Sequence, residues 1–358
     1  MQAVVKCHAR EGLWMCDVAK PDPAPGEVLV KVRKTGICGT DLHIWNWDEW
    51  ARGAIAVPTT VGHEFVGEIV ELGRDVTHLS CGQRVSGEGH VVCMHGRAAR
   101  AGRPHHSAQM EAIGITLPGA FAEYLVLPAA NVVPLPDAIP DDIAAILDPL
   151  GNAVHAALSF DLAGEDVLVT GAGPIGIMAA AVARHAGARK VVVTDINPGR
   201  LALARAVVDA TTVDVSARPL ADAIGELDIG DGFAVGLEMS GAPSAFDTMV
   251  DAMAPGGRIA YLGIAPRPML VDWTRIIFKS LIIKGIYGRE MFRTWHRMIA
   301  LLESGLNVEP VITHRLDAAD FVSGFEAMRS GRAGKVVLSW PPGTSVAARR
   351  SAAERVEA

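Results

Sequence analysis

Three residues in the first fifth of the chain carry side chains that zinc accepts in a catalytic site. Cys38 lies in the stretch ICGTD, and His63 and Glu64 are adjacent in VGHEF. Thiolate, imidazole and carboxylate form a ligand set that can hold zinc while one position stays open. Further along, LDPLGNAVH supplies Asp148 as a candidate fourth ligand or a group beside the ion. Each residue alone is a weak indication, since a lone cysteine or histidine is usually structural.

A second motif, VLVTGAGPIG at residues 167–176, predicts a dinucleotide site. A strand leads into three glycines at G-x-G-x-x-G spacing and a helix follows, which allows a tight turn, close approach of a pyrophosphate and close helix packing. The next strand ends at Asp195, whose carboxylate can accept both ribose hydroxyls and would repel a 2′-phosphate. NAD is therefore favoured over NADP, although Arg200 nearby could accommodate a 2′-phosphate. The three glycines are Gly171, Gly173 and Gly176.

Composition limits the class of protein. The 358 residues are half hydrophobic and carry a formal net charge of −7, without a basic stripe or tail. We therefore expect neither a nucleic-acid partner nor an anionic membrane surface. The amino terminus lacks the apolar core of a signal peptide, so a cytoplasmic location is expected. Five cysteines without a paired framework suit a reducing compartment, and disulfides are not expected.

The secondary-structure elements that must position these residues follow two different sequence patterns. Residues 1–146 show short alternating runs such as EVLVKVRK, which are typical of a β-rich domain. Within residues 147–288, apolar strands alternate with Ala-rich helices, which predicts an α/β domain with a doubly wound parallel sheet. Residues 289–341 end in the strand KVVLSW and are expected to return to the first domain. Residues 342–358 are polar and small, and we expect a disordered tail.

The motifs together resemble the zinc-dependent medium-chain dehydrogenase/reductase family. The resemblance is carried by ICGTD, GHEFVGEIVELG and the central glycine motif. Longer stretches, including KTGICGTDLHIWNWDEW, GLEMSGAP, IKGIYGREMF and AMRSGRAGKVVLSW, are similar to the branch that oxidises L-threonine, from about residue 1 to 340. The resemblance implies a GroES-like catalytic domain, a Rossmann domain, a catalytic zinc, NAD and a cytoplasmic homotetramer. It implies oxidation of the C3 hydroxyl to give 2-amino-3-oxobutanoate.

The same resemblance implies roles for individual residues. Cys38, His63 and Glu64 match the catalytic zinc positions, and Asp148 matches an acidic residue beside that ion. Thr40 and His43 match a pair that relays the proton released by the substrate. The positions that match NAD contacts are Ile175, Asp195, Arg200, Leu262, Gly263, Ile264, Ile286 and Tyr287.

The loop CMHGRAARAGRPHHS at residues 93–107 departs from the family pattern. The family holds a structural zinc there through four cysteines, and only Cys93 matches; Gly96, Ala99 and Ser107 occupy the other positions. Because a structural zinc needs four good donors, we expect this ion to be absent. A substitute site remains an alternative, built from Cys93, His95, His105 and His106.

Two other functions remain open at this stage. An NAD-dependent polyol dehydrogenase of the sorbitol or butanediol type would share the fold and cofactors and differ in its substrate pocket. A noncatalytic relative would keep the fold and lose the chemistry. The joint presence of the predicted metal ligands and relay residues argues against this alternative; they are Cys38, Thr40, His43, His63 and Glu64. Within WNWDEW, Asp48 and Glu49 could attract the substrate ammonium, or could be solvated acids of a tryptophan-rich seam.

Overall fold

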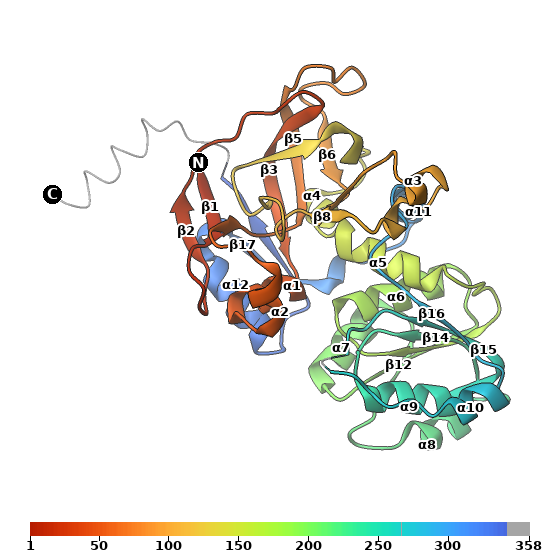
Figure 1. The fold of residues 1–358 in the computed structure, drawn as a ribbon. Coiled ribbons are helices and arrows are strands. Elements are labelled where there is room, and N and C mark those ends of the chain that lie inside the picture. The colour runs from red at the N-terminus through yellow and green to blue at the C-terminus, as the bar shows by residue number, and fades with distance from the viewer. Residues whose placement is uncertain (266, 342–358) are drawn as a thin grey trace.

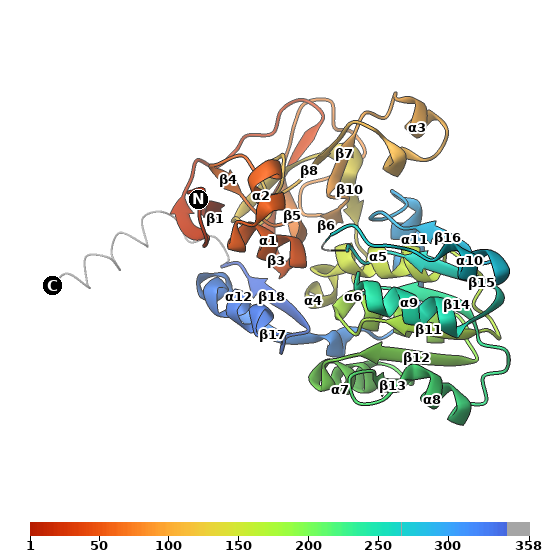
Figure 2. The same ribbon diagram turned by 60° about the horizontal axis from the view of Figure 1, so that its bottom comes forward.

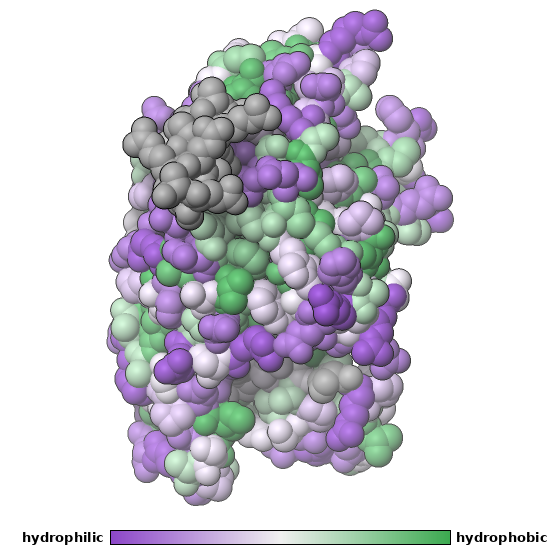
Figure 3. All heavy atoms as spheres, turned by 90° about the vertical axis from the view of Figure 1, so that its left-hand side faces the viewer, coloured by the Kyte–Doolittle hydropathy of each residue, from purple (hydrophilic) through white to green (hydrophobic). Residues whose placement is uncertain are grey.

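The computed structural model describes residues 1–265 and 267–341, so the predicted tail at 342–358 lies outside the described part. A β-rich part, built from both ends of the chain, lies beside an α/β part (Figure 1). No helix in the described residues is long and apolar enough to cross a membrane. On the face shown in Figure 3, hydrophobic and hydrophilic residues are intermixed.

The β-rich part centres on a seven-stranded sheet with the order β10-β6-β5-β3-β18-β17, in which β9 also pairs with β3. A three-stranded sheet has the order β2-β1-β4, and β7 pairs with β8. Short helices lie between these strands and after β17. The elements are β1 (Gln2–Lys6), β2 (Trp14–Asp17), β3 (Glu27–Ile37), α1 (Gly39–Asn46), α2 (Glu49–Ala54), β4 (Thr59–Thr60), β5 (Glu64–Leu72), β6 (Arg84–Gly87), β7 (His90–Val92), α3 (Arg97–Arg100), η1 (Pro104–His106), β8 (Met110–Ala112), β9 (Tyr124–Pro128), η2 (Ala129–Asn131), β10 (Val132–Pro134), α4 (Asp141–Ala144), η3 (Glu309–Val311), β17 (Ile312–Asp317), η4 (Ala318–Asp320), α12 (Phe321–Arg329) and β18 (Lys335–Ser339).

The α/β part confirms the predicted doubly wound parallel sheet. Its six strands have the order β13-β12-β11-β14-β15-β16, and every pair is parallel. Strand β11 is buried along its whole length, as expected for a strand covered on both faces. The elements are α5 (Leu147–Ala157), β11 (Asp166–Thr170), α6 (Pro174–His185), β12 (Lys190–Asp195), α7 (Pro198–Val207), β13 (Thr211–Asp214), α8 (Leu220–Glu226), β14 (Phe233–Glu238), α9 (Pro243–Ala252), β15 (Met253–Tyr261), α10 (Trp273–Phe278) and β16 (Ile282–Gly285). Helix α11 (Arg293–Glu303) follows this sheet in the chain and contacts α5.

Two features of the fold bring residues that are distant in sequence toward the predicted metal ligands. Helix α5 lies between the β-rich part and α6 in both ribbon views (Figures 1 and 2), and Asp148 lies in its first turn. Strand β18, close to the end of the described chain, pairs antiparallel with β3, with Val336 opposite Ile37. This pairing places Lys335 beside the carboxyl end of β3.

Candidate active site

Two neighbouring strands bring the three predicted metal ligands together. Cys38 follows β3 and is the N-cap residue of α1, while Glu64 begins β5 opposite Gly36 of β3. One ligand atom from each of Cys38, His63 and Glu64 lies within 4.8 Å of the others. In residues 1–265 and 267–341, no other group of three His, Cys, Asp or Glu side chains meets this criterion. The donor set and spacing therefore fit a zinc ion.

Asp41 is a neighbour of this group that sequence reasoning missed. It is fully buried, and its Oδ2 accepts a hydrogen bond of 2.9 Å from the Cys38 amide. Its Oδ1 lies 3.9 Å from Nδ1 of His63, and neither atom has a hydrogen-bond partner among the described residues. A carboxylate behind a histidine commonly orients that histidine toward a metal. These two unpartnered buried atoms are a further sign that the site is built for an ion.

The electrostatics of His63 agree with this arrangement. Burial lowers the pKa of His63, but the charges of Cys38 and Asp41 outweigh burial and hold this pKa well above its ordinary value. A site that favours a cation on an imidazole also favours a metal cation in the same place.

Glu64 has a buried partner, Lys335, that sequence reasoning also missed. Nζ of Lys335 lies 2.7 Å from Oε1 and 2.6 Å from Oε2 of Glu64, and it donates to the Ile37 carbonyl at 2.7 Å. Both side chains are buried. Burial raises the pKa of Glu64, and the Lys335 ammonium opposes this rise. Lys335 and a zinc ion would therefore compete for the same carboxylate.

Asp148 does not join the three-ligand group, but a buried arginine holds it in place. Nη1 of Arg289 lies 2.7 Å from Oδ1 of Asp148. The same guanidinium donates through Nε to Oε2 of Glu88 at 3.0 Å, and Nε1 of Trp295 donates to that oxygen at 3.1 Å. Burial alone would raise the pKa of Glu88, but Arg289 lowers it to about 2. The result is a buried network of one guanidinium and two carboxylates, in which Asp148 has a fixed position.

Thr40 and His43 lie on α1, directly after Cys38. Oγ1 of Thr40 is 3.7 Å from Sγ of Cys38. The His43 side chain is 60 % exposed, and its Nδ1 lies 2.5 Å from Oδ2 of Asp48. The helix thus runs from the metal-ligand group to a solvent-exposed imidazole.

Asp48 has a structural explanation. It is the N-cap residue of α2, where Oδ1 accepts a 3.0 Å hydrogen bond from the Ala51 amide. Its other oxygen contacts His43. Burial opposes the charged form, but the Ala51 amide and His43 together lower the pKa of Asp48. These contacts give Asp48 a structural role beside His43.

The three glycines of the dinucleotide motif have three different environments. Gly171 has a φ of +93°, which favours glycine. A Cβ added at Gly176 would lie 1.9 Å from the Gly171 carbonyl oxygen, whereas one at Gly173 would meet nothing within 4 Å. Gly173 is also the N-cap residue of α6. The helix amino terminus is therefore open to a phosphate group, as in dinucleotide sites.

The other predicted cofactor contacts follow the carboxyl ends of neighbouring strands. Asp195 ends β12, and its two oxygens accept hydrogen bonds from the amides of Ala172 at 2.7 Å and Asn197 at 2.8 Å. Arg200 lies in the first turn of α7, and its Nε is buried without a partner among the described residues. The remaining predicted contacts lie in the first turn of α6 and after β15 and β16; they are Ile175, Leu262, Gly263, Ile264, Ile286 and Tyr287.

Two features at the carboxyl ends of these strands, which we call the cofactor edge, bear on binding. Ile264 is 91 % exposed and Tyr287 is 64 % exposed, so both leave apolar surface for a ligand to cover. Glu238, which sequence reasoning missed, is buried at the end of β14 and accepts hydrogen bonds from the amides of Ser240 and Gly241. Strands β11 and β14 flank the point where the strand order reverses, which is the usual ligand crevice of such sheets.

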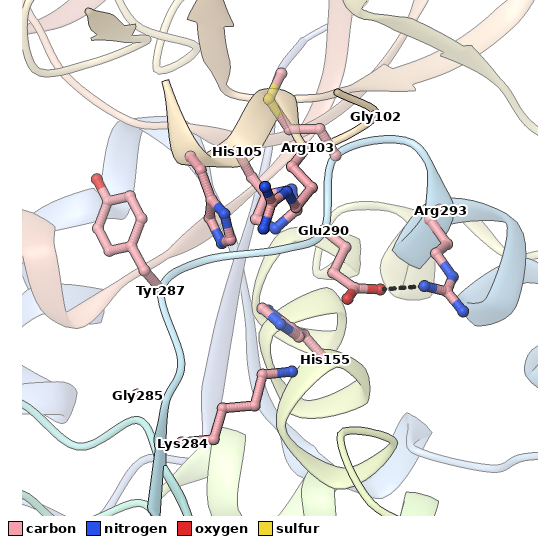
Figure 4. Close-up of a pocket in the computed structure, with 11 residues that line it drawn as sticks. Gly102, Arg103, His105, His155, Lys284, Gly285, Tyr287, Glu290 and Arg293 are labelled. Atoms are coloured by element: carbon pink, nitrogen blue, oxygen red, sulfur yellow. Dashed lines mark ion pairs between the residues drawn. The ribbon is translucent and has the colours of Figure 1, made fainter. Parts of the chain in front are cut away.

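The loop at 93–107 is ordered by local contacts and by packing on α5. Its exposed Cys93 begins a turn, and Arg103 donates to the Ala98 carbonyl at 2.9 Å. His105 lies 4.2 Å from His106 and 6.1 Å from His155 of α5, measured between ring centroids. Figure 4 shows His105 and His155 at a cavity of about 330 Å³. The four side chains of the substitute metal site do not come within reach of one ion.

Comparisons with known proteins agree with this geometry. Residues 24–137 match the alcohol dehydrogenase GroES-like domain, and residues 174–304 match the zinc-binding dehydrogenase domain. The chain is 62 % identical over 341 residues to L-threonine 3-dehydrogenase of Ruegeria pomeroyi, covering 95 % of this chain and all of that protein. The corresponding enzyme of Escherichia coli K12 is 59 % identical over 340 residues, with the same coverage. An E. coli CFT073 alcohol dehydrogenase, solved with NADH, has a TM-score of 0.86 at 27 % identity and covers 95 % of this chain and 99 % of its own. The chain therefore belongs to the zinc-dependent medium-chain dehydrogenase/reductase family, in the group of the L-threonine 3-dehydrogenases.

Proposed function

We propose that this protein oxidises L-threonine at C3 with NAD⁺, giving 2-amino-3-oxobutanoate and NADH. The observation that carries the reaction type is the grouping of Cys38, His63 and Glu64 within 4.8 Å. The names of relatives that are 58–62 % identical along almost the whole chain support the substrate.

The ligand group and its neighbours have separate tasks. A zinc ion held by Cys38, His63 and Glu64 would supply Lewis-acid chemistry that lowers the pKa of a bound hydroxyl. Oδ1 of Asp41 lies 3.9 Å from Nδ1 of His63, so its negative charge favours a cation at this imidazole, and Lys335 shares the Glu64 carboxylate with the ion. We assign Asp148 to the charge balance beside the ion rather than to direct ligation, because Arg289 holds its Oδ1 at 2.7 Å.

Helix α1 carries the proton away from the reacting hydroxyl. The Thr40 hydroxyl lies next to Cys38 and can accept the substrate proton while donating its own. His43 then receives that proton and releases it to water, to which its side chain is exposed. Asp48 favours the His43 tautomer that is protonated on Nδ1, which leaves Nε2 free to accept.

The cofactor edge favours NAD. The Asp195 carboxylate is held rigidly by two backbone amides, with lone pairs left for ribose hydroxyls. Its negative charge would repel the 2′-phosphate of NADP. NAD bound here would supply the hydride acceptor for C3 of the substrate. Gly173 at the start of α6 leaves room for a pyrophosphate.

We assign one zinc ion per subunit and no structural zinc. The loop at 93–107 offers one thiol, Cys93, and its three histidines do not gather with it around one point. Packing against His155 and the hydrogen bonds of the loop replace the ion as its support. Metal analysis of the purified protein tests this stoichiometry, and two firmly bound zinc ions per subunit would contradict it.

We also propose a homotetramer with the catalytic domain at 1–146 and 289–341 and the nucleotide-binding domain at 147–288. Strand β16 is an edge strand with unpaired backbone groups. Large hydrophobic side chains near it are exposed, and a second copy of the chain would cover them; they are Leu270, Trp273, Ile277, Phe278 and Ile282. We place the protein in the cytoplasm, because its five cysteines show no paired framework along the sequence. Light scattering after size-exclusion chromatography measures the assembly.

A steady-state assay of NADH formation tests the activity. Zinc-loaded protein should turn over L-threonine with a kcat/KM at least tenfold above those for 2,3-butanediol and sorbitol. Cys38→Ser should abolish this activity, whereas the matched Cys81→Ser variant, which changes an exposed cysteine outside the ligand group, should keep it. Preference for a polyol, or full activity of Cys38→Ser, would contradict the proposal.

A further inference from the structure

Two cysteines outside the active site lie in direct contact. Sγ of Cys7 is 3.0 Å from Sγ of Cys16. Cys7 immediately follows β1, and Cys16 lies in β2, which pairs antiparallel with β1. A covalent disulfide has an S–S distance of about 2.05 Å, so the two sulfur atoms need to approach by only about 1 Å.

The surroundings of this pair are suited to holding it. Both cysteines are half-buried and pack on a small apolar cluster of Ala3, Val5 and Ala122. Burial, together with the neighbouring Cys16 thiol, raises the pKa of Cys7 to about 11. Cys7 is therefore protonated at neutral pH and can donate a hydrogen bond to Cys16, which keeps the two sulfur atoms in contact.

We propose that Cys7 and Cys16 form a reversible dithiol–disulfide site whose oxidants are small-molecule disulfides of the glutathione type. The spacing of the five cysteines along the sequence carries no sign of this pair. The contact forms where Cys7, just after β1, meets Cys16, which lies opposite Ala3 in the strand pair. The site requires neither the zinc ligands nor the dinucleotide edge, so the proposal is independent of the substrate assigned above.

The reaction balances as two successive thiol–disulfide exchanges. A thiolate of the pair attacks one sulfur of the small disulfide, forms a mixed disulfide and releases one thiolate of the reagent. The second cysteine, after losing its proton, attacks the protein sulfur and releases the second thiolate. The protein loses two protons and two electrons, and one small disulfide becomes two thiols.

The bond would close the loop of residues 8–15. Lys6 already ties this loop to α1, because its Nζ donates to the carbonyl of Gly12 at 3.0 Å and to that of Trp45 at 3.5 Å. A disulfide at the base of the loop removes conformational freedom from the unfolded chain. We therefore expect oxidation to raise the midpoint of thermal unfolding of the β-rich part by a few degrees.

The test uses the full-length, zinc-loaded protein. It is incubated with oxidised glutathione at pH 7 and pH 9, alkylated and digested with trypsin. Cleavage after Lys6 and Arg10 separates Cys7, in residues 7–10, from Cys16, in residues 11–31, because Lys20 precedes Pro21 and resists cleavage. We expect these two peptides to be linked, faster at pH 9 than at pH 7, and to separate after reduction with dithiothreitol.

Matched variants complete the experiment. In Cys7→Ser and Cys16→Ser, the remaining cysteine can form only a mixed disulfide with glutathione, which mass spectrometry detects as an adduct. A double variant with Cys81→Ser and Cys93→Ser removes two exposed thiols and should still form the link. Wild-type protein that keeps a glutathione adduct on Cys7 or Cys16 without linking them would overturn the proposal. So would a folded chain that does not link under conditions in which the urea-unfolded chain does.

Discussion

The buried ion pair between Lys335 and Glu64 leads to a prediction about stability and metal binding together. Lys335→Met keeps most of the side-chain volume but removes the ammonium that contacts both Glu64 oxygens. In the zinc-free protein Glu64 would then lose its nearest cation and keep only the His63 imidazole beside it. The carboxylate must either take up a proton or remain charged with weaker compensation, and both cost free energy.

The magnitude follows from the geometry. At 2.6 Å, two unit charges attract each other by about 6 kcal/mol with an effective dielectric constant of about 20. Desolvation offsets part of this attraction, and breaking a buried pair by removing one partner typically costs about 3–5 kcal/mol. We expect a loss of that size in the free energy of unfolding of zinc-free protein. With zinc bound the loss should be smaller, because the ion replaces the missing positive charge.

Urea unfolding followed by tryptophan fluorescence measures both states, and competition with a chelator measures zinc affinity. Lys335→Met should bind zinc at least about tenfold more tightly, because a cation next to the site has been removed. Combining it with Glu64→Gln should recover part of the lost stability, since no unpaired charge remains. A zinc-free Lys335→Met protein that loses less than about 1 kcal/mol, with no coupling to Glu64→Gln, would refute the reasoning.

Three further predictions concern the network, the cofactor and the proton relay. The folded pKa of Glu88 is about 2, below its ordinary value of 4.5, so its contribution to stability is present above about pH 4.5 and is lost as the pH falls toward 2. Between pH 5 and pH 3 the loss should be about 2 kcal/mol, and urea unfolding of Glu88→Gln should show a pH dependence flatter by that amount. Asp195→Asn should lower kcat/KM for NAD about ten- to a hundredfold, since charged hydrogen bonds to ribose contribute about 1.5–3 kcal/mol. It should also reduce the ratio of kcat/KM for NAD to that for NADP. An unchanged ratio would contradict the assigned role of Asp195. His43→Asn should lower kcat about a hundredfold or more. Asp48→Asn should have a smaller effect on kcat, because asparagine can still cap α2. Equal kcat values for the wild type and His43→Asn would exclude the relay.

The cofactor edge could be predicted from the sequence because its determinants are local. The glycine motif and Asp195 lie within one strand–helix–strand unit, so their spacing along the chain fixes their spacing in space. Cys38 and the pair His63 and Glu64 are farther apart, but they lie at the ends of two adjacent antiparallel strands. Their residue types and the family resemblance were sufficient to predict that they come together as candidate ligands, and the structure groups their ligand atoms within 4.8 Å.

The partners of these residues could not be predicted in the same way. Lys335 is 271 residues from Glu64, and Arg289 is 201 residues from Glu88. A buried ion pair between such distant residues leaves no periodic pattern in the sequence. Without the arrangement of the strands, each of its members would be predicted to be a surface charge. Asp48 shows the converse, because the sequence left both a cation site and a solvated acid open, and neither alternative predicts that it caps α2 and contacts His43.

The most direct test of the proposed reaction follows the hydrogen on C3 of the substrate. L-Threonine carrying deuterium at C3 is oxidised by the zinc-loaded protein, and the reduced cofactor is analysed by mass spectrometry. Hydride transfer predicts one deuterium in every NADH formed, and Cys38→Ser should form none. Reduced cofactor without deuterium, or no reduction of NAD⁺ by L-threonine, would contradict the assignment of this site to threonine oxidation.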